Sequence, residues 1–539
     1  MLLPLRVNPA ISFFIMTYLT IPIVAKNPDQ ARHQIETALL AGAEMLELRV
    51  DYIENLTADV VKGLIVEIRT RAAKNVPVIV TCRDKHQGGA TDYPAGLRID
   101  TLAAALKAGA EYVDFEYENF LAPENRGKIR SALSQSLKGK LILSTHNFQG
   151  KFPQISNLYR HVQTMYVASV PKLVYTANHI NDCFEAFDLL HNTGGERIIF
   201  CMGQAGLISR IIAKKLGSLV TFASIDEQTA TAPGQITIEQ FKKLYRYDAI
   251  TPGTELYGVI GSPVTHSLSP AIHNAGFADI GANKLYLPLL VDGGAPEFSE
   301  FMRNVLARPW LGFRGFSITI PHKESAMDYV RGKGGFVEPL ARRIGAVNTI
   351  LITKDGALKA YNTDYAGALD AITTAMEITR EQLNGIPVAV LGAGGVARAA
   401  VAGLTDVGAR VTIYNRTISR AEKLAAEFGC DFAGLDKLAQ IDAKLLINCT
   451  SIGMHPNVNE TPIPKEFLKK DMTVFDTIYN PAETLLLKQA KEAGCQTISG
   501  LDMFLNQALV QFKLFTGTDA NPDLVRKTVL DCLSRRQLI

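Results

Sequence analysis

The chain has little of what marks secreted, metal-dependent or nucleic-acid-binding proteins. Its 539 residues include only one tryptophan and seven cysteines. An odd number of scattered cysteines, with no C-x-x-C pair, argues against a disulfide framework and a structural zinc site and favours free thiols in a reducing compartment. Lysine and arginine number 56 against 53 aspartates and glutamates, a net charge of +3. This near-balance predicts neither a nucleic-acid nor a membrane-surface partner.

Long hydrophobic runs are also absent, because no stretch reaches the ~18 uninterrupted apolar residues of a transmembrane helix. Residues 11–25 are largely apolar, as in a secretory signal, but Pro22 interrupts them and no small-x-small cleavage site follows. We therefore predict a cytoplasmic protein with a short leader over residues 1–15, whose true start is Met1 or Met16.

The first half of the chain repeats one unit eight times, a short apolar run followed by a helical pattern. Strands buried on both faces form continuous apolar runs, and their alternation with helices such as 29–41 and 102–108 predicts a parallel sheet. Eight units in about 230 residues favour a closed (β/α)8 barrel over an open doubly wound sheet. The predicted strands are 18–24, 44–50, 78–82, 112–117, 141–146, 172–176, 197–202 and 219–223.

Ionisable side chains occupy five consecutive predicted strands. In a (β/α)8 barrel the active site lies at the carboxyl ends of the strands. The sequence therefore predicts a polar site at that end of the barrel. The side chains are Glu47, Arg49 and Asp51 on the second strand, Arg83 after the third, Asp114 and Glu116 on the fourth, His146 on the fifth, and Lys172 at the start of the sixth.

The repeat defines a barrel domain over residues 16–246. A linker is predicted over residues 247–254, because they contain a Pro-Gly turn and interrupt the alternation of apolar strands and helices. A mixed α/β domain is expected over 255–384, and a Rossmann-like domain over 385–499. The C-terminal residues 500–539 have a helical pattern and are expected to complete the 255–384 domain.

A dinucleotide-binding fingerprint opens the Rossmann-like domain. The apolar strand 388–391 runs into Gly392-Ala393-Gly394-Gly395-Val396-Ala397, and a helix is predicted over 398–407. This is G-x-G-x-x-A between a strand and a helix. The first glycine permits the tight turn, the second lets the backbone approach a pyrophosphate, and the helix N-terminus binds the anion. We predict that these six residues contact a dinucleotide.

The following strand, 409–414, ends in Asn415-Arg416-Thr417. Arg416 lies about 20 residues after Gly394, where an NAD enzyme carries an acid for the ribose hydroxyls. No acid is present, and a guanidinium binds phosphate through bidentate contacts. These three residues therefore predict NADP rather than NAD.

Further motifs are spread over both halves of the chain. The first half holds Met202-Gly203 through Ser209-Arg210 and Thr231-Ala232-Pro233-Gly234-Gln235. The second holds Gly261-Ser262-Pro263-Val264-Thr265-His266-Ser267-Leu268-Ser269-Pro270, Phe316-Ser317-Ile318-Thr319-Ile320-Pro321-His322-Lys323, Gly345-Ala346-Val347-Asn348-Thr349, Tyr361-Asn362-Thr363-Asp364, Asn448-Cys449-Thr450 and Asp476-Thr477-Ile478-Tyr479-Asn480-Pro481.

With these motifs the first half resembles type I 3-dehydroquinate dehydratase, a (β/α)8 enzyme, and the second resembles shikimate dehydrogenase. In this order they resemble the bifunctional fusion of plants and some bacteria. The resemblance implies a shikimate-pathway enzyme that dehydrates 3-dehydroquinate to 3-dehydroshikimate and then reduces that product to shikimate with NADPH. It leaves the oligomeric state open.

For the first half, the resemblance implies that Lys172 forms an imine with the substrate ketone and that His146 moves protons. An iminium is a better electron sink than a ketone, and burial beside cations such as Arg83 and Arg210 favours the nucleophilic amine. Histidine has a suitable pKa to act as base and then as acid. The implied substrate contacts are Glu47, Arg49, Arg83, Arg210, Thr231 and Gln235, with Glu47 and Arg49 also orienting His146 and Arg210 binding the carboxylate.

For the second half, the resemblance implies that Lys323 and Asp364 form the general acid–base pair. Ser269 is expected to cap a helix with Pro270 at its first position, and Ser267 and Ser269 to hold the substrate carboxylate there. The other implied substrate contacts are Thr319, Asn348, Tyr479 and Gln507. The implied cofactor contacts beyond the fingerprint and Asn415-Arg416-Thr417 are Thr450, Thr477, Ile478 and Gly500.

One position departs from the dehydratase pattern. Gln87 stands where many relatives have glutamate, and a neutral amide cannot act as a base. Two other functions stay open: a catalytically decayed regulator built from the same domains, and a quinate-preferring dehydrogenase. A decayed regulator should have lost at least one of the four catalytic candidates, and all four are present. The pair of serines at 267 and 269 favours shikimate.

Overall fold

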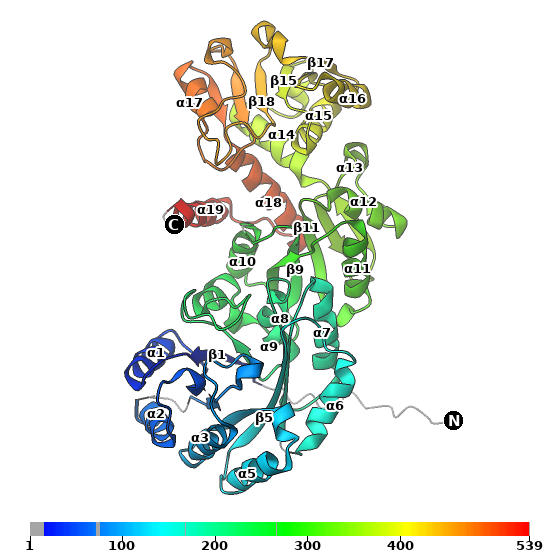
Figure 1. The fold of residues 1–539 in the computed structure, drawn as a ribbon. Helices are drawn as coiled ribbons and strands as arrows, with labels where there is room; N and C mark the ends of the chain where they lie inside the picture. The colour runs from blue at the N-terminus through cyan, green and yellow to red at the C-terminus, as the bar shows by residue number, and fades with distance from the viewer. Residues whose placement is uncertain (1–15, 72–75, 168, 266, 538–539) are drawn as a thin grey trace, which may run out of the picture. The chain divides into compact units, whose positions relative to one another are not determined.

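The computed structural model describes residues 16–71, 76–167, 169–265 and 267–537 (Figure 1). The expected leader, residues 1–15, lies outside these ranges. The described residues form two compact units. The first comprises the chain up to Glu255 together with Asn283–Asp292 and Glu300–Arg308, and the second comprises the rest. None of the helices in these ranges combines the length and apolarity needed to span a bilayer.

The first unit is built around an eight-stranded parallel sheet in the order β7-β6-β5-β4-β3-β2-β1-β8. The Leu219 N–H donates to the Arg197 carbonyl at 2.8 Å and joins the two ends of this order into a near-closed barrel. The eight predicted strands are thus confirmed. They are β1 (Tyr18–Ile23), β2 (Met45–Arg49), β3 (Val78–Thr81), β4 (Tyr112–Glu116), β5 (Lys140–Asn147), β6 (Ser169–Thr176), β7 (Ile198–Met202) and β8 (Val220–Phe222).

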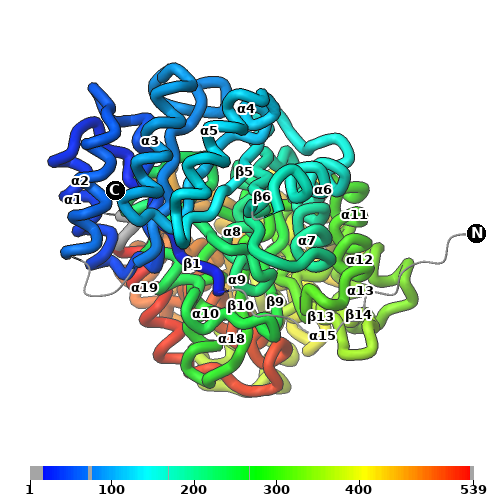
Figure 2. Tube along the Cα trace, turned by 90° about the horizontal axis from the view of Figure 1, so that it is seen from below, coloured from blue at the N-terminus to red at the C-terminus, as the bar shows by residue number. Residues whose placement is uncertain are grey.

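Helices follow the strands and surround them, as α1, α2, α3, α5, α6 and α7 do in Figure 2. Helix α1 begins after Asn27, whose side chain accepts a hydrogen bond from the Gln30 N–H, and Pro28 occupies its first turn. The helices are α1 (Pro28–Leu40), α2 (Ala58–Arg71), α3 (Ala95–Lys107), α4 (Tyr117–Phe120), α5 (Pro123–Ser134), α6 (Ile155–Met165), α7 (Cys183–Asn192), α8 (Leu207–Ile211) and α9 (Ala213–Leu216).

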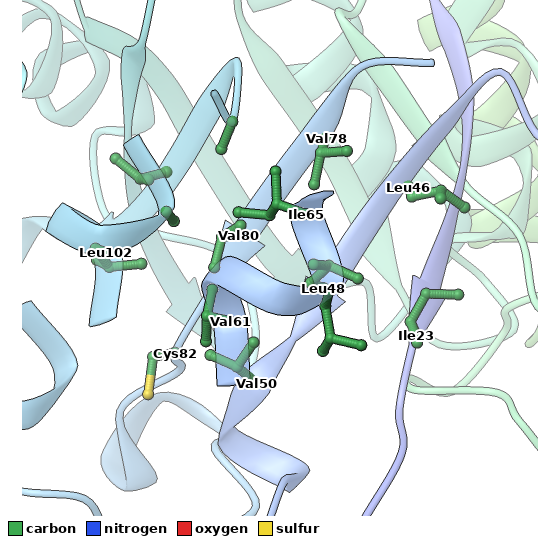
Figure 3. Close-up of a cluster of buried hydrophobic side chains, with 14 of the residues drawn as sticks. Ile23, Leu46, Leu48, Val50, Val61, Ile65, Val78, Val80, Cys82 and Leu102 are labelled. Atoms are coloured by element: carbon green, nitrogen blue, oxygen red, sulfur yellow. The ribbon is translucent and has the colours of Figure 1, made fainter. Parts of the chain in front are cut away.

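Alternation along the strands divides the barrel into two apolar layers. Leu46 and Leu48 of β2 pack outward with Val61 and Ile65 of α2, in the fully buried cluster of Figure 3. Met45, which is in phase with Glu47, belongs to a separate cluster that fills the interior. Because successive side chains point to opposite faces of a strand, the same alternation turns Glu47 and Arg49 into the barrel.

Two predicted boundaries in the barrel were wrong. Helix α3 begins at Ala95, seven residues before the predicted start, because Pro94 precedes a polar first turn that the apolar pattern did not include. Strand β6 begins at Ser169, so Lys172 is its fourth residue and not its first. Pro171 masked this start, because proline is unusual inside a sheet. Tyr247, which lies in the expected linker, is fully buried, and its hydroxyl donates to the Thr17 carbonyl at 2.7 Å.

The second unit contains a mixed sheet and a parallel sheet. The mixed sheet places β9 (Glu255–Gly261), β11 (Phe313–Ile318), β13 (Thr349–Ile352), β14 (Leu358–Tyr361) and β12 (Phe336–Val337) in that order, with β13 antiparallel to both neighbours. The chain also forms β10 (Lys284–Leu290), α10 (Ser269–Asp279), α11 (Ala295–Leu306), α12 (Lys323–Gly332) and α13 (Pro339–Ile344).

The parallel sheet has the order β17-β16-β15-β18-β19-β20. This is the strand order of a dinucleotide-binding Rossmann fold, with β15 as its first strand, so the predicted fold class is confirmed. Its strands are β15 (Pro387–Leu391), β16 (Arg410–Tyr414), β17 (Asp431–Ala433), β18 (Leu445–Asn448), β19 (Thr473–Asp476) and β20 (Gln496–Ile498). Its helices are α15 (Gly395–Asp406), α16 (Ile418–Phe428) and α17 (Leu485–Glu492), and α14 (Thr363–Met376), α18 (Gly500–Thr516) and α19 (Pro522–Gln537) complete the unit.

Two candidate active sites

A cavity opens at the carboxyl ends of the barrel strands. It is lined by six of the residues predicted there (Glu47, Arg49, Arg83, His146, Lys172 and Arg210), by Thr231 of the loop after β8, and by Gln87, Gly88, Phe148, Val174, Phe200, Met202, Phe222 and Ala232. The structure therefore brings chemistry-bearing residues of strands β2, β5 and β6, and of the segments that follow β3, β7 and β8, into one site. Phe148 was missed, although it lies two residues after His146, the spacing that returns a side chain to the same face.

Lys172 is buried and makes an ion pair at the base of this cavity. Its Nζ donates to Asp114 Oδ2 at 2.8 Å and lies 3.7 Å from Glu47 Oε1 and 5.0 Å from the centre of the Phe222 ring. The expected burial is present, and the charged groups within 4 Å of the amine are the carboxylates of Asp114 and Glu47 rather than the guanidinium groups of Arg83 and Arg210. Asp114 holds the amine in place, and its negative charge can receive the proton that the ammonium must lose before it becomes a nucleophile.

Asp114 is the centre of a buried polar network. Its Oδ2 also accepts from Arg83 Nη2 at 2.8 Å, and its Oδ1 accepts from the Ser144 hydroxyl at 2.5 Å. Arg83 continues the network to Glu116 at 2.9 Å. Burial alone would raise the pKa of Asp114, but the charges of Arg83 and Lys172 hold that pKa far below its usual range. The carboxylate is therefore ionised at neutral pH.

Arg210 is a buried cation that makes no ion pair with the described residues. Its Nε and Nη2 have no hydrogen-bond partner among the described residues, and the guanidinium stacks 4.6 Å from the centre of the Phe200 ring. Burial lowers the pKa of Arg210 to about 10, which still leaves it charged at neutral pH. An unpaired buried charge is costly, so this group is poised to bind an anionic ligand that enters the cavity.

His146 is oriented by Gln87. The Gln87 Oε1 lies 2.9 Å from the His146 backbone nitrogen and 3.1 Å from Nδ1 of the imidazole. The two predicted orienting residues line the same cavity, but their hydrogen bonds go to other side chains: Glu47 accepts from the Thr81 hydroxyl, and Arg49 makes a two-pronged ion pair with Asp51. Burial and the cations Arg83 and Lys172 lower the pKa of His146 well below 6.5, so the imidazole is neutral at neutral pH.

Of the two predicted residues on the loop after β8, only Thr231 lines the cavity. Gln235 supports it from behind, because its Oε1 accepts from the Thr231 N–H at 2.7 Å and from the Thr231 hydroxyl at 3.0 Å. The Gln235 Nε2 is buried and has no partner among the described residues.

A second cavity lies in the second unit, beside the mixed sheet. Its lining includes the predicted residues Ser267, Ser269, Thr319, Lys323, Asn348, Asp364, Val396, Thr477, Tyr479, Gly500 and Gln507. Residues from eight separate segments thus meet at one site. Gln511, which also lines it, was missed, although it follows Gln507 by one helical turn, the spacing that places two side chains on one face.

Lys323 and Asp364 face each other in this cavity. Lys323 Nζ donates to Asp364 Oδ2 at 2.7 Å, and Asn348 Nδ2 donates to Asp364 Oδ1 at 2.9 Å. The Asp364 N–H is held in turn by Asn362, which caps α14. Both carboxylate oxygens are therefore occupied, whereas the ammonium of Lys323 has two further N–H groups.

The serine turn differs in detail from its prediction. Helix α10 begins at Ser269, and its N-cap is Leu268, so Ser269 is a helical residue and not the cap. The Ser267 hydroxyl accepts from the Ser269 N–H at 3.2 Å and takes over the capping contact. Both serine hydroxyls still line the cavity.

The fingerprint glycines make the space that a dinucleotide requires. Gly392 has φ +107°, and a Cβ there would lie 3.2 Å from the Thr450 methyl group. Gly394 is the N-cap of α15, and a side chain at Gly394 or Gly395 would meet open space. The helix begins three residues earlier than predicted, so Val396 and Ala397 lie in its first turn, where backbone N–H groups are free for an anion. These residues fit a pyrophosphate.

Arg416 is exposed just after the end of β16 and makes no ion pair among the described residues. The neighbouring Asn415 Nδ2 donates to the Thr417 carbonyl at 2.8 Å and shapes the turn. At the opposite edge, the Thr477 hydroxyl donates to the Asn448 carbonyl at 2.8 Å, and Ile478 is buried. Tyr479 stacks on Phe504 with ring centres 5.1 Å apart.

Comparison with known families gives three matches along the chain. The type I 3-dehydroquinase family matches residues 19–252. The substrate binding domain of shikimate dehydrogenase matches 259–350, and the shikimate 5'-dehydrogenase C-terminal domain matches 500–530.

Individual relatives match either the whole chain or its second half. The chloroplastic bifunctional 3-dehydroquinate dehydratase/shikimate dehydrogenase of Arabidopsis thaliana is 36% identical over 526 residues, 93% of this chain and 82% of that protein. The NADP(+) shikimate dehydrogenase of Methanosarcina acetivorans is 42% identical over 52% of this chain and 98% of its own. A solved structure of Thermus thermophilus shikimate 5-dehydrogenase with NADP(H) and shikimate covers 52% of this chain and 99% of its own, at 33% identity and a TM-score of 0.46.

Proposed function

Because the chain belongs to the family of bifunctional 3-dehydroquinate dehydratase/shikimate dehydrogenases, we propose a division of its two reactions between the two cavities. The protein dehydrates 3-dehydroquinate to 3-dehydroshikimate and reduces 3-dehydroshikimate to shikimate with NADPH. The barrel cavity is the proposed dehydratase site, and the cavity of the second unit is the proposed dehydrogenase site.

In the dehydratase reaction, the Lys172 amine adds to the substrate ketone and water leaves, which forms a protonated imine. His146 removes a proton from the adjacent carbon, and the electrons of that C–H bond pass to the imine nitrogen. The enamine then expels the hydroxyl group, which takes up the proton from His146 and leaves as water. Hydrolysis of the imine releases the product and the free lysine. The supporting observation is one buried lysine, paired with Asp114, in the same cavity as a neutral histidine.

Substrate binding in the barrel is proposed to rest on charge. The guanidinium of Arg210 binds the carboxylate, because the ligand then supplies an anion that no described residue provides. Glu47, Arg49 and Arg83 contact the hydroxyl groups from the opposite wall, and Thr231, held by Gln235, closes the cavity.

In the dehydrogenase reaction, bound NADPH supplies the hydride. Lys323 donates a proton to the substrate oxygen, because Asp364 has both oxygens engaged and Lys323 has N–H groups to spare. Ser267 and Ser269 bind the carboxylate, and Thr319, Asn348, Tyr479 and Gln507 contact the rest of the substrate.

The residues proposed to hold NADPH form three groups around the first Rossmann strand. Residues 392–397 hold the pyrophosphate at the start of α15, and Asn415, Arg416 and Thr417 bind the 2'-phosphate. Thr450, Thr477, Ile478 and Gly500 form the wall on the nicotinamide side. The free, exposed guanidinium of Arg416 supports a phosphate ligand there.

The proposed domain division is a barrel over 16–246, a linker over 247–254, a substrate domain over 255–384 completed by 500–539, and an NADP domain over 385–499. The family matches to 19–252, 259–350 and 500–530 support this division.

A cytoplasmic location is also proposed, because all seven cysteines are free thiols. Cell fractionation tests that location, since the Arabidopsis relative is chloroplastic.

Reduction of the imine tests the dehydratase proposal. Incubation with 3-dehydroshikimate and borohydride should attach the reduced ligand to Lys172, identified by peptide mass spectrometry. The exposed Lys151, which pairs with Glu185, serves as the internal control peptide and should stay unmodified. An active enzyme that forms no adduct at Lys172 would refute the imine.

A further inference from the structure

The carboxylate of Glu118 reaches the dehydratase histidine through an intervening amide. Glu118 lies on the short helix α4, and its Oε2 accepts from Gln87 Nε2 at 3.2 Å. Its other oxygen accepts from the Thr145 hydroxyl at 2.7 Å. Gln87 in turn contacts His146 through Oε1. These contacts join an acid outside the cavity to the proposed acid–base residue inside it.

The contacts of the amide determine which of its ends faces the histidine. The backbone N–H of His146 can only donate, so it requires the oxygen of Gln87. An ionised Glu118 can only accept, so it requires the nitrogen. The two requirements agree, and reversing the amide would put two donors together at one end and two acceptors together at the other. Gln87 is therefore held in one orientation from both sides.

This orientation selects the tautomer of His146. The Gln87 Oε1 can only accept a hydrogen bond, so the imidazole proton must sit on Nδ1, which lies 3.1 Å away. A neutral imidazole with its proton on Nδ1 has a free lone pair on Nε2. A lone pair on the atom that meets the substrate is what a general base needs.

We propose that Glu118 is a positioning residue of the dehydratase, which fixes the Gln87 amide and through it the reactive tautomer of His146. This inference rests on the dehydratase role proposed for the barrel cavity. It gives Gln87, the position that departs from the family pattern, a function that does not need a titratable side chain. It also assigns a role to an exposed acid that lines neither cavity.

The arrangement keeps a negative charge away from the imidazole. The charged groups that face His146 are Arg49, Arg83 and Lys172, with Asp114 as the opposing anion, and burial with Arg83 and Lys172 favours its neutral form. A carboxylate at position 87 would favour the imidazolium instead. With the acid displaced to Glu118, His146 is oriented and stays a neutral base.

The first test compares Glu118→Ala with Glu118→Gln. Alanine removes the acceptor, so the dehydratase kcat should fall about tenfold while KM for 3-dehydroquinate changes less than twofold. Glutamine can still offer an oxygen to Gln87 and should keep at least half of the wild-type kcat. Glu124→Ala is the matched control, because Glu124 is exposed on α5 and its one partner in the described part of the chain is Lys128. Dehydrogenase activity of the same chain, measured with shikimate and NADP, reports whether each variant is folded.

The second test exchanges the acid and the amide. Gln87→Glu alone places two carboxylates in contact and should lower kcat about tenfold. The double variant Gln87→Glu/Glu118→Gln should recover to within threefold of wild type, because one acceptor and one donor again meet. Its profile of kcat/KM against pH should differ, since the carboxylate beside His146 raises the pKa of the imidazole. In wild type, the fall of kcat/KM on acidification should occur below pH 6.5, because the pKa of His146 is lowered. In the double variant this fall should begin at higher pH.

Nitrogen NMR of labelled histidines reads the tautomer directly, with His146→Gln used to assign the signal. Wild type should show a protonated Nδ1, and Glu118→Ala a mixture of both tautomers. Full activity and an unchanged tautomer in Glu118→Ala, or Gln87→Glu as active as wild type, would overturn the proposal. A wild-type protein with no activity on 3-dehydroquinate would instead refute the dehydratase assignment on which the proposal rests.

Discussion

Replacement of Asp114 by asparagine should destabilise the barrel more than any loss of a surface charge. Asp114 is fully buried and accepts hydrogen bonds from Lys172, Arg83 and Ser144. Asparagine has nearly the same shape, so the change leaves no cavity. It removes the charge that compensates two buried cations, and only Arg83 retains a carboxylate partner within 3 Å, Glu116.

The magnitude follows from the cost of breaking a buried ion pair. Removal of one partner costs about 3–5 kcal/mol, because the other charge is left uncompensated. Since Glu116 still pairs with Arg83, we expect the lower end, about 3 kcal/mol. For a domain of this size that is a fall of roughly 6–12 °C in unfolding temperature. Folding lowers the pKa of Asp114, so this stabilisation is fully present above about pH 4 and is lost only on further acidification.

The measurement is thermal unfolding at pH 7 by scanning calorimetry, in which the two units are followed as separate transitions because a two-unit protein does not unfold in one step. The transition of the barrel should move to lower temperature in Asp114→Asn, and this readout does not depend on the activity of a variant that has lost the partner of Lys172. Asp29→Asn is the control, since Asp29 is exposed on α1 and its one ion pair among the described residues is with Arg32, so the change should leave the unfolding temperature nearly unchanged. A loss below about 1 kcal/mol for Asp114→Asn would refute the buried network as a source of stability.

Three further changes separate binding, chemistry and cofactor choice. Arg210→Met should lower dehydratase kcat/KM about 100-fold, as expected for about 3 kcal/mol of charge-assisted hydrogen bonds. It should also raise the unfolding temperature of the barrel, because it removes an unpaired buried cation. A lower unfolding temperature would contradict the cost assigned to that cation. Asp364→Asn should lower the dehydrogenase kcat at least about 100-fold, while the Kd for NADPH, measured by fluorescence titration, stays unchanged. A kcat near that of wild type would exclude Asp364 from the acid–base pair. Arg416→Leu should reduce the preference for NADPH over NADH about tenfold or more; equal kcat/KM ratios in variant and wild type would remove Arg416 from the phosphate site.

Much of the fold could be predicted because hydrophobic burial has a local signature. Strands buried on both faces of a parallel sheet are continuous apolar runs, and eight of them were visible in the first half. The Rossmann strand and glycine turn were visible for the same reason. The ends of helices and strands were predicted wrongly where a residue at the boundary does not fit the apolar pattern of the element. Pro171 hid the start of β6, and the cap of α10 moved by one residue because the Ser267 hydroxyl makes the contact expected of Ser269.

The site residues could be identified by type, but their partners could not. Whether Lys172 meets a carboxylate or a guanidinium depends on the register between β4, β5 and β6, and no local pattern sets that register. The contact between Gln87 and His146 spans 59 residues of chain and two loops. The resemblance to the dehydratase family identified Gln87 as a departure from glutamate, whereas only the fold shows that Glu118 lies behind it.

The central claim is that one chain carries two reactions in separate cavities, and the most direct test follows NADPH absorbance after addition of 3-dehydroquinate. Wild type should oxidise NADPH with either 3-dehydroquinate or 3-dehydroshikimate. Lys172→Ala should respond only to 3-dehydroshikimate, and Lys323→Ala should respond to neither while still converting 3-dehydroquinate to 3-dehydroshikimate. A wild-type protein that oxidises NADPH with 3-dehydroshikimate alone, or a Lys172→Ala variant that still uses 3-dehydroquinate, would contradict the account.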